Sequence, residues 1–353
     1  MTASPNQSGI SQADLEAAIA AGVIERDQAN RLTGFVSTRA VASGQADEEN
    51  FRLISGFNDI FVTIGLALFI GALSYLTAGF SVAISAAAIA VVAWGLAEIF
   101  TKRKRLALPS IALLAVYAVA IFMAVANVIG GVGAFALVAD DNSHGNSYAW
   151  AIAGLATAVA AYVHWRRFHV PITVAAGFTA MAVTAIALVA GFIPGVLDQY
   201  SALIYLPLGL AAFGLAMWFD MSDRSRQTRR TDIAFWLHLL AAPLIVHPVV
   251  LNLTSENDMT IVNAGTILML FVVLSAVALI VDRRALLVSS LSYLGYAAIT
   301  LIASTRWESS AAALAVLAVG AVVLLLSVAW RPLRALLMGL VPQAIRIRVP
   351  HAV

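Results

Sequence analysis

The chain has 353 residues, of which 61% are hydrophobic and only 11% are charged, and its formal net charge at pH 7 is +2. A soluble domain is about 45–50% apolar and about 25% charged, so this composition excludes a water-soluble fold and makes the lipid bilayer the expected partner. Because the sequence contains no cysteine, disulfides and thiolate metal sites are also excluded.

Residues 1–50 form a polar head that precedes the first apolar run. Ser11 and Asp14 have the spacing of a helix-capping pair, and Gly22 is placed to end this first helix. A second helix is predicted over residues 25–39, followed by a polar linker. The head is therefore expected to be a small cytoplasmic helical hairpin that offers a surface to a protein partner.

Residues 51–330 contain apolar runs long enough to cross a bilayer, whose hydrocarbon core of about 30 Å needs roughly 20 residues of helix. Charged and turn-forming residues fall in the gaps between these runs. The pattern predicts an all-α, polytopic transmembrane helix bundle with about ten spans. The spans are expected near residues 60–79, 81–100, 106–128, 148–165, 170–192, 200–219, 233–252, 260–281, 285–304 and 309–330.

Lys and Arg are distributed unevenly between the loops that this span order places on the two sides of the membrane. With the N-terminus inside, all but Arg306 of the 21 basic residues fall in the head, the inner loops or the tail. The outer loops instead carry carboxylates such as Asp140, Asp141 and Asp198. Since cytoplasmic loops retain Lys and Arg, both termini are predicted to be cytoplasmic, and a miscounted span would destroy the pattern.

The apolar run from Leu106 to Ala139 tests the span count. As one helix it would be about 51 Å long, too long for a single straight span. Two spans would place every later basic loop outside. One span is therefore predicted, broken near Gly130, Gly131 and Gly133, where glycine permits a bend.

Residues 331–353 mix arginines with Leu336, Leu337 and Leu340. One interpretation places this basic tail at the inner membrane surface, where anionic lipids attract Arg. The other treats its arginines as the ordinary flanking charge of the last span.

The seventh span is unusual because it contains His238, Pro243, His247 and Pro248. Pro243 frees backbone carbonyls that another group must satisfy. Nine residues separate the two imidazoles, which puts them on opposite faces of a straight helix and argues against a shared metal. Each His is expected either to hydrogen-bond a neighbouring helix or to line a transport path, with His238 the stronger candidate because it lies nearer the basic inner surface.

Other polar side chains within the spans are candidates for the same polar path. The alternative is that they let helices approach and hydrogen-bond one another. Asp220 and Glu98 fall near span ends, where Glu98 is expected to form an interfacial ion pair beside Lys102, so no carboxylate relay crosses a span. The candidate path residues are Asn127, Asn263, Ser292, Tyr293 and Tyr296.

The sequence shows no nucleophile–base set, no Gly-rich phosphate loop and no metal-ligand cluster, so neither an enzyme nor a cofactor or metal is predicted. Nucleic acid is not expected as a partner, because membrane orientation already explains the loop arginines. The oligomeric state is not set by the sequence.

The segment from Asp14 to Ala29, with its Leu, Gly-x-Ile and Gln-Ala elements, and the closing segment from Ala329 to Pro342 resemble the two ends of a family of bacterial predicted membrane proteins. Members of this family begin with a short helical hairpin and continue into a multi-span bundle. The resemblance implies a bacterial inner-membrane location and no particular activity.

Two classes of function fit these features. The first is a small-solute transporter or permease, with two five-span blocks, 60–192 and 200–330, of which the second would be an inverted copy. Here Pro207 and Gly209, opposite Gly65 and Gly71 in the first span, would mark discontinuous helices. The alternative is a non-enzymatic scaffold or sensor that uses the head as its interaction module.

The predicted orientation can be tested with single cysteines, because the native chain has none. Ser143→Cys, in an outer loop, should react with a membrane-impermeant thiol reagent in intact cells, whereas Ser225→Cys, in an inner loop, should not. The opposite labelling pattern would overturn the assigned orientation.

Overall fold

The computed structural model describes residues 12–42, 57–131, 144–223, 226, 228–254, 261–288, 291–292, 294–295, 309–346 and 349. All regular secondary structure in these ranges is helical. The chain divides into two compact units, a head unit of Met1–Phe51 with Val353 and a bundle unit of Arg52–Ala352. The two units are described separately.

The head unit contains α1 (Gln12–Ala20) and α2 (Arg26–Ala42), close to the predicted bounds. Gly22 takes a left-handed conformation with φ of 67°, which suits the turn between them. The side-chain oxygen of Gln28 accepts a 2.9 Å hydrogen bond from the Glu25 backbone N–H, as in a capping box. Ser11 lies outside the described residues, and the role of the head as a hairpin module stays a prediction.

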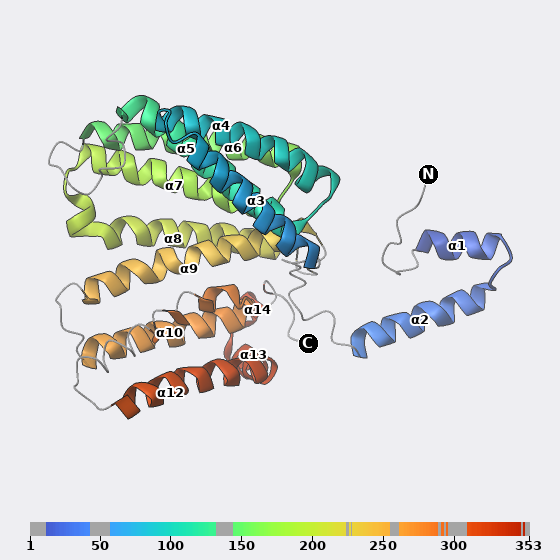
Figure 1. Ribbon diagram of the computed structural model, residues 1–353. Coiled ribbons are helices and arrows are strands. Elements are labelled where there is room, and N and C mark those ends of the chain that lie inside the picture. Colours follow the sequence, from blue (N-terminus) through green and yellow to red (C-terminus); the bar gives the residue numbers. More distant parts are fainter. Residues whose placement is uncertain are drawn as a thin grey trace. The chain divides into compact units, whose positions relative to one another are not determined.

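The helices of the bundle unit lie side by side, and α4 to α12 run roughly parallel to a common direction (Figure 1). Extensive contacts join α4 to α5, α5 to α6, α6 to α7 and α8 to α9. The helices are α3 (Phe57–Leu76), α4 (Val82–Ala97) with its π-helical extension η1 (Glu98–Arg103), α5 (Ala107–Gly130), α6 (His144–Phe168), α7 (Ile172–Phe192), α8 (Val196–Ser222), α9 (Arg229–Thr254), α10 (Ile261–Val281), α12 (Ser309–Val328), α13 (Trp330–Leu340) and α14 (Gln343–Arg346).

Among the described residues, six helices are long and apolar enough to cross a membrane. The number rises to seven if α12 and α13, which meet at an angle of 76°, form one bent span. The predicted multi-span helical membrane protein is therefore supported. Most of the expected ninth span, 285–304, lies outside the described residues, so the count of ten and the orientation stay predictions.

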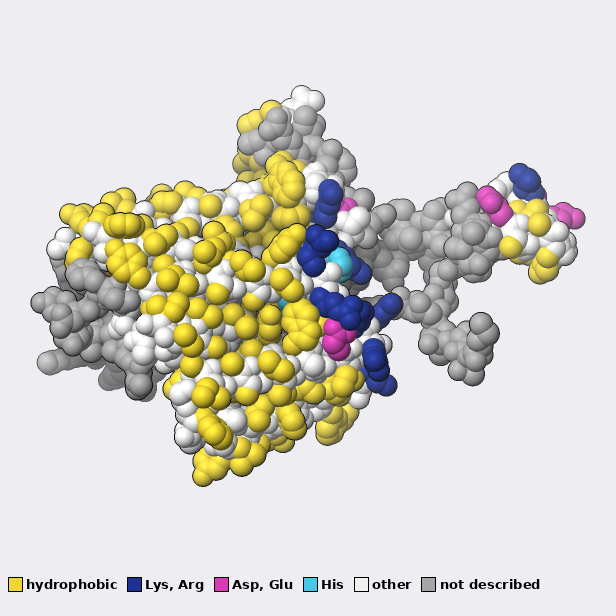
Figure 2. Space-filling view, turned by 90° about the horizontal axis from the view of Figure 1, so that it is seen from above, with side chains coloured by type: hydrophobic (Ala, Val, Ile, Leu, Met, Phe, Trp, Pro, Cys, Tyr) yellow, Lys and Arg dark blue, Asp and Glu magenta, His cyan; other side chains and the backbone are white. Residues whose placement is uncertain are grey.

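The outer surface of the bundle unit separates by side-chain type, as Figure 2 shows. Apolar side chains cover the flanks of the helices, and Lys and Arg gather at one end of them, which we call the basic end. Large apolar side chains such as Leu68, Val91 and Leu203 are exposed on these flanks. A surface of this kind suits hydrocarbon on the flanks and a charged interface at the basic end.

Small residues let the helices of the bundle unit approach closely. Several of its fully buried side chains are alanines, including Ala93, Ala153 and Ala216. A Cβ added at Gly154 of α6 would lie 2.9 Å from the carbonyl oxygen of Ala180 on α7. Lipid provides little hydrophobic drive for helix association, so close contact between small residues has to supply it.

The break expected in the apolar run from Leu106 to Ala139 is present at Gly130 and Gly131. Helix α5 ends at Gly130, and Gly131 follows with φ of 67°, a conformation that costs other residues energy. The extension predicted beyond this point, including Gly133, lies outside the described residues.

The expected discontinuity at Pro207 and Gly209 is absent. Helix α8 continues through both residues and departs from helical geometry at Tyr200 instead, where φ is −131° and ψ is 31°. Helix α3 likewise continues through Gly65 and Gly71. Gly209 serves packing rather than bending, because a Cβ there would lie 2.8 Å from the Ile245 side chain and 3.0 Å from its backbone nitrogen.

Replacing Gly209 with Ala should therefore destabilise the bundle by about 1–3 kcal/mol, the usual cost of overpacking. Gly214→Ala in the same helix is the matched control, because a Cβ at Gly214 meets nothing within 4 Å. Denaturation of the purified proteins in detergent, followed by circular dichroism, measures both changes. Equal stabilities of the two variants would contradict the close approach of α8 and α9.

Candidate functional site

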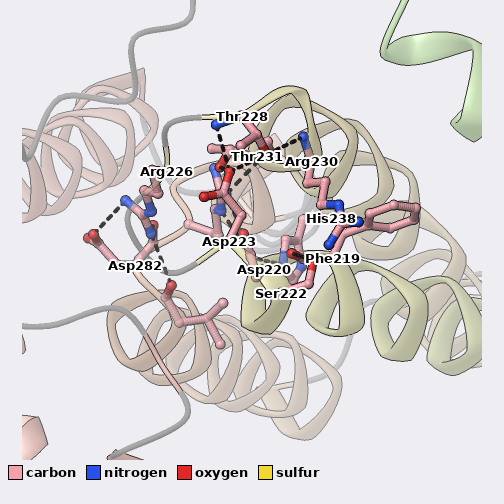
Figure 3. Close-up of polar contacts among 12 residues, drawn as sticks. Phe219, Asp220, Ser222, Asp223, Arg226, Thr228, Arg230, Thr231, His238 and Asp282 are labelled. Atoms are coloured by element: carbon pink, nitrogen blue, oxygen red, sulfur yellow. Dashed lines mark hydrogen bonds and ion pairs between the residues drawn. The ribbon is translucent and has the colours of Figure 1, made fainter.

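Buried charged side chains gather at the basic end of the bundle unit, where α8 and α10 end and α9 and α13 begin (Figure 3). Asp220, Arg283 and Arg334 are 2%, 1% and 3% exposed, and their partners are similarly enclosed. We call this group the ion cluster. Its members are Asp220, Asp223, Arg226, His238, Asp282, Arg283 and Arg334.

The first part of the ion cluster is the pair between Asp220 and Arg283. Asp220 lies in the last turn of α8, and Arg283 follows the end of α10. The guanidinium donates through Nε to Asp220 Oδ2 at 3.1 Å and through Nη2 to Oδ1, which is the forked geometry that suits a carboxylate. Nη2 also donates to the Thr231 carbonyl of α9 at 3.3 Å. One side chain therefore joins three helices.

His238 of α9 lies beside the Asp220–Arg283 pair and is fully buried. Its Nε2 lies 2.9 Å from Asp220 Oδ2, so the imidazole donates there when Nε2 carries the proton. The Phe213 ring stands edge-on to it at 5.4 Å. The other ring nitrogen, Nδ1, has no hydrogen-bond partner among the described residues, which leaves a buried acceptor unsatisfied.

The second part of the ion cluster centres on Asp282, which ends α10 in a left-handed conformation with φ of 59°. Arg226 Nη1 donates to Asp282 Oδ2 at 2.8 Å, and Trp330 Nε1 donates to Oδ1 at 2.8 Å. Arg334 Nη1 lies 3.6 Å from Oδ2, and its Nε donates to the Leu279 carbonyl at 3.1 Å. Asp282 thus holds the α8–α9 connection and α13 against the end of α10.

Asp223 organises the start of α9. Its Oδ2 accepts hydrogen bonds from the Thr228 backbone N–H at 2.8 Å, the Thr228 hydroxyl at 2.6 Å and the Thr231 hydroxyl at 3.0 Å. A carboxylate at a helix N-terminus satisfies free N–H groups and complements the helix dipole. This cap fixes the start of α9 beside the other charges.

The ion cluster contains equal numbers of carboxylates and guanidinium groups, namely Asp220, Asp223 and Asp282 with Arg226, Arg283 and Arg334. Bringing such groups out of water costs several kcal/mol per ion, and their attraction only offsets that cost when the geometry is good. Removing one partner leaves an uncompensated buried charge, so each member depends on the others.

A separate pair joins α6 to the start of η1. Arg167 donates to Glu98 through Nε at 2.6 Å and through Nη2 at 2.8 Å. The expected interfacial ion pair of Glu98 is present, but Lys102 is only a distant partner at 4.0 Å. Lys102 lies four residues along the same helix, whereas Arg167 reaches the carboxylate from a neighbouring helix with a forked group.

The sequence-predicted polar residues do not converge on one site. His238 lies in the ion cluster, whereas His247 is exposed, as the opposite-face spacing predicted. The Asn127 side chain donates to the Met123 carbonyl and the Ser292 hydroxyl to the Val288 carbonyl, each to a residue four positions earlier in the chain. The side chain of Asn263 and the whole of Tyr293 and Tyr296 lie outside the described residues.

Sequence reasoning missed most of the ion cluster. From sequence alone, Asp220 resembles an ordinary span-end carboxylate, and Arg334 is expected either to meet anionic lipid or to be flanking charge. The lipid interpretation is wrong for Arg334, which points into the bundle and pairs with Asp282. One sequence feature could have indicated a buried charge cluster. Asp282 and Arg283 follow an apolar span directly, and opposite charges at one depth of the membrane can neutralise each other.

Comparison with known proteins gave no match, because neither a family model nor a curated protein nor a solved structure is significantly similar to this chain. Among the described residues, no group of three or more His, Asp or Glu side chains has the arrangement of a metal site.

Asp220→Asn should destabilise the protein by about 3–5 kcal/mol, because it leaves the buried Arg283 guanidinium without its counter-charge. Glu98→Gln is the matched control, and because its pair is partly exposed we expect about 0–1 kcal/mol. Thermal unfolding of the purified variants in detergent measures both. If Arg283→Gln fails to recover part of the loss in the Asp220→Asn background, the two groups are not coupled.

Proposed function

We propose that the chain is an inner-membrane carrier of small solutes whose cytoplasmic side is closed by the ion cluster. The observation that carries the proposal is the contact of Asp220, His238 and Arg283, which joins α8, α9 and the end of α10. In this proposal the basic end is the cytoplasmic end, in agreement with the distribution of Lys and Arg.

A permanently closed bundle would gain little from such a group. Well-packed apolar residues of similar volume usually stabilise a buried site as well as an ion pair does. Buried charges in membrane proteins are costly, and they mark proton and ion pathways. A charge cluster that joins helix ends, and includes an imidazole, therefore fits an element with two states better than a fixed support.

Proton binding gives the proposed closure a means of release. In the closed state Asp220 is neutralised by Arg283, and His238 is uncharged. A proton taken up by His238 adds a second positive charge beside Arg283, with Arg226 also nearby. The site then carries excess positive charge in a medium of low dielectric, which favours the separation of Arg283 and its helix from α8 and α9. Imidazole is suited to this step because it is the side chain whose unperturbed pKa lies between pH 5 and pH 8.

Alternating access requires that one side opens while the other closes. All members of the ion cluster belong to the second five-span block or to the tail, so in this proposal that block moves against the first. The relation between the two blocks as inverted copies is part of the proposal.

A second function is favoured by the head. Residues Met1–Phe51 form a compact unit of their own, which is the organisation expected of an interaction module. In this alternative the chain is a membrane scaffold or sensor, and the ion cluster only fixes the bundle.

Thiol reactivity distinguishes the two functions. Ala278, fully buried in the packing of α9, α10 and α13, is the reporter position for opening at the basic end. Ile193, exposed between α7 and α8, is the control that corrects for the pH dependence of the thiol itself. In nanodiscs, the reactivity of Ala278→Cys relative to Ile193→Cys should rise by roughly tenfold on going from about pH 8 to about pH 5.

The same measurement in the His238→Gln background should show no rise, because Gln keeps a hydrogen bond to Asp220 but cannot titrate near neutral pH. A relative reactivity that is flat with pH in the native background would favour the scaffold. A rise that persists in His238→Gln would remove His238 from the mechanism.

A further inference from the structure

A hollow of about 540 Å³ opens at the basic end between the end of α6 and the α8–α9 connection. Its aromatic and apolar walls come from Trp165 and Phe219, with the His169 ring 5.5 Å from that of Trp165. Its polar lining comes from Thr228, Arg229 and Arg230 at the start of α9. The volume is in the range of small-molecule sites in proteins.

The two arginines give this hollow a positive charge that the ion cluster does not cancel. Arg229 and Arg230 are exposed, unlike Arg283 and Arg334, which are buried against carboxylates. The nearby Asp223 carboxylate is already engaged by Thr228 and Thr231. Asp232 is the other neighbouring carboxylate, and it interacts with both Arg229 and Arg283. The Arg230 side chain makes no ion pair with the described carboxylates.

The depth of the hollow indicates the kind of anion. The hollow lies where α8 ends at Ser222 and α9 begins at Arg229. This is the boundary between the apolar flanks and the basic end of the bundle unit (Figure 2). A Trp ring beside arginines is typical of the headgroup region of a membrane. A soluble anion would need no apolar wall, whereas a lipid brings a charged phosphate and an apolar glycerol backbone to the same place.

We propose that this hollow binds the phosphate of an anionic phospholipid. Arg229 and Arg230 bind the phosphate oxygens, and Thr228 forms part of the wall of the site. Trp165 and Phe219 contact the glycerol and the first methylenes of the acyl chains. A lipid bound here rests against both α6 and α9, so it links the two halves of the bundle unit at the basic end. This site is independent of the proposed transport.

The test uses the full chain purified in a neutral detergent and titrated with short-chain phosphatidylglycerol, with phosphatidylcholine of the same chain length in parallel. Native mass spectrometry counts the lipids retained. Arg229→Gln/Arg230→Gln should weaken phosphatidylglycerol binding by roughly tenfold or more, because two cations near a phosphate are lost. The matched control is Arg103→Gln/Lys104→Gln, which removes the same charge from exposed residues of another loop at the basic end and should leave binding unchanged.

Two further measurements separate the alternatives. Arg229→Lys/Arg230→Lys keeps the charge and should retain most of the binding. Inorganic phosphate at millimolar concentration should not displace the lipid. If the Arg229→Gln/Arg230→Gln variant and the control variant lose phosphatidylglycerol binding equally, the lipid binds to a diffuse basic surface. If inorganic phosphate displaces the lipid, the hollow is a site for soluble anions. Either result overturns the proposal.

Discussion

The structure depends most on the requirement that a charge buried near the end of a membrane helix has a counter-charge at the same depth. Asp220 and Arg283 meet this requirement across two helices, and removing either would leave the other as an uncompensated buried charge. Further contacts are made by Arg283 and by its chain neighbour Asp282. Arg283 also bonds the Thr231 carbonyl, which fixes α9, and the neighbouring Asp282 collects Arg226, Trp330 and Arg334.

The helical framework could be predicted from sequence because its cause is local. A bilayer needs long apolar helices, so each run of apolar residues specifies a helix without knowledge of its neighbours. Six of the expected spans correspond to described helices that are long and apolar enough to cross a membrane, or seven if α12 and α13 form one bent span, and α5 ends where Gly130 and Gly131 predicted. The discontinuity expected at Pro207 and Gly209 in α8 was wrong because the role of Gly209 is not set locally. Gly209 is explained by Ile245 on another helix, and no local pattern records that contact.

The ion cluster was predicted only in part because its cause is not local. His238 stood out, since an imidazole inside an apolar span needs a partner wherever that span packs. Its actual partner lies 18 residues earlier, on α8, and Arg283 lies still further along the chain. Each carboxylate or arginine taken alone resembles ordinary flanking charge. Only the packing of α8, α9, α10 and α13 shows that Asp220 and Asp282 face inward.

The middle and the basic end of the described bundle are therefore held by different forces, and this difference bears on motion. Along their lengths the helices associate through small residues such as Ala153 and Ala216, where contact is close but each interaction is weak and indifferent to pH. At the basic end, α8, α9, α10 and α13 are joined by a few strong contacts that share Asp220 and Asp282. Contacts of this second kind fail together when one charge is neutralised or added, because each buried ion is compensated only by the others. If the basic end changes state, as proposed for the closure, the helices of such a bundle can stay packed at their middles.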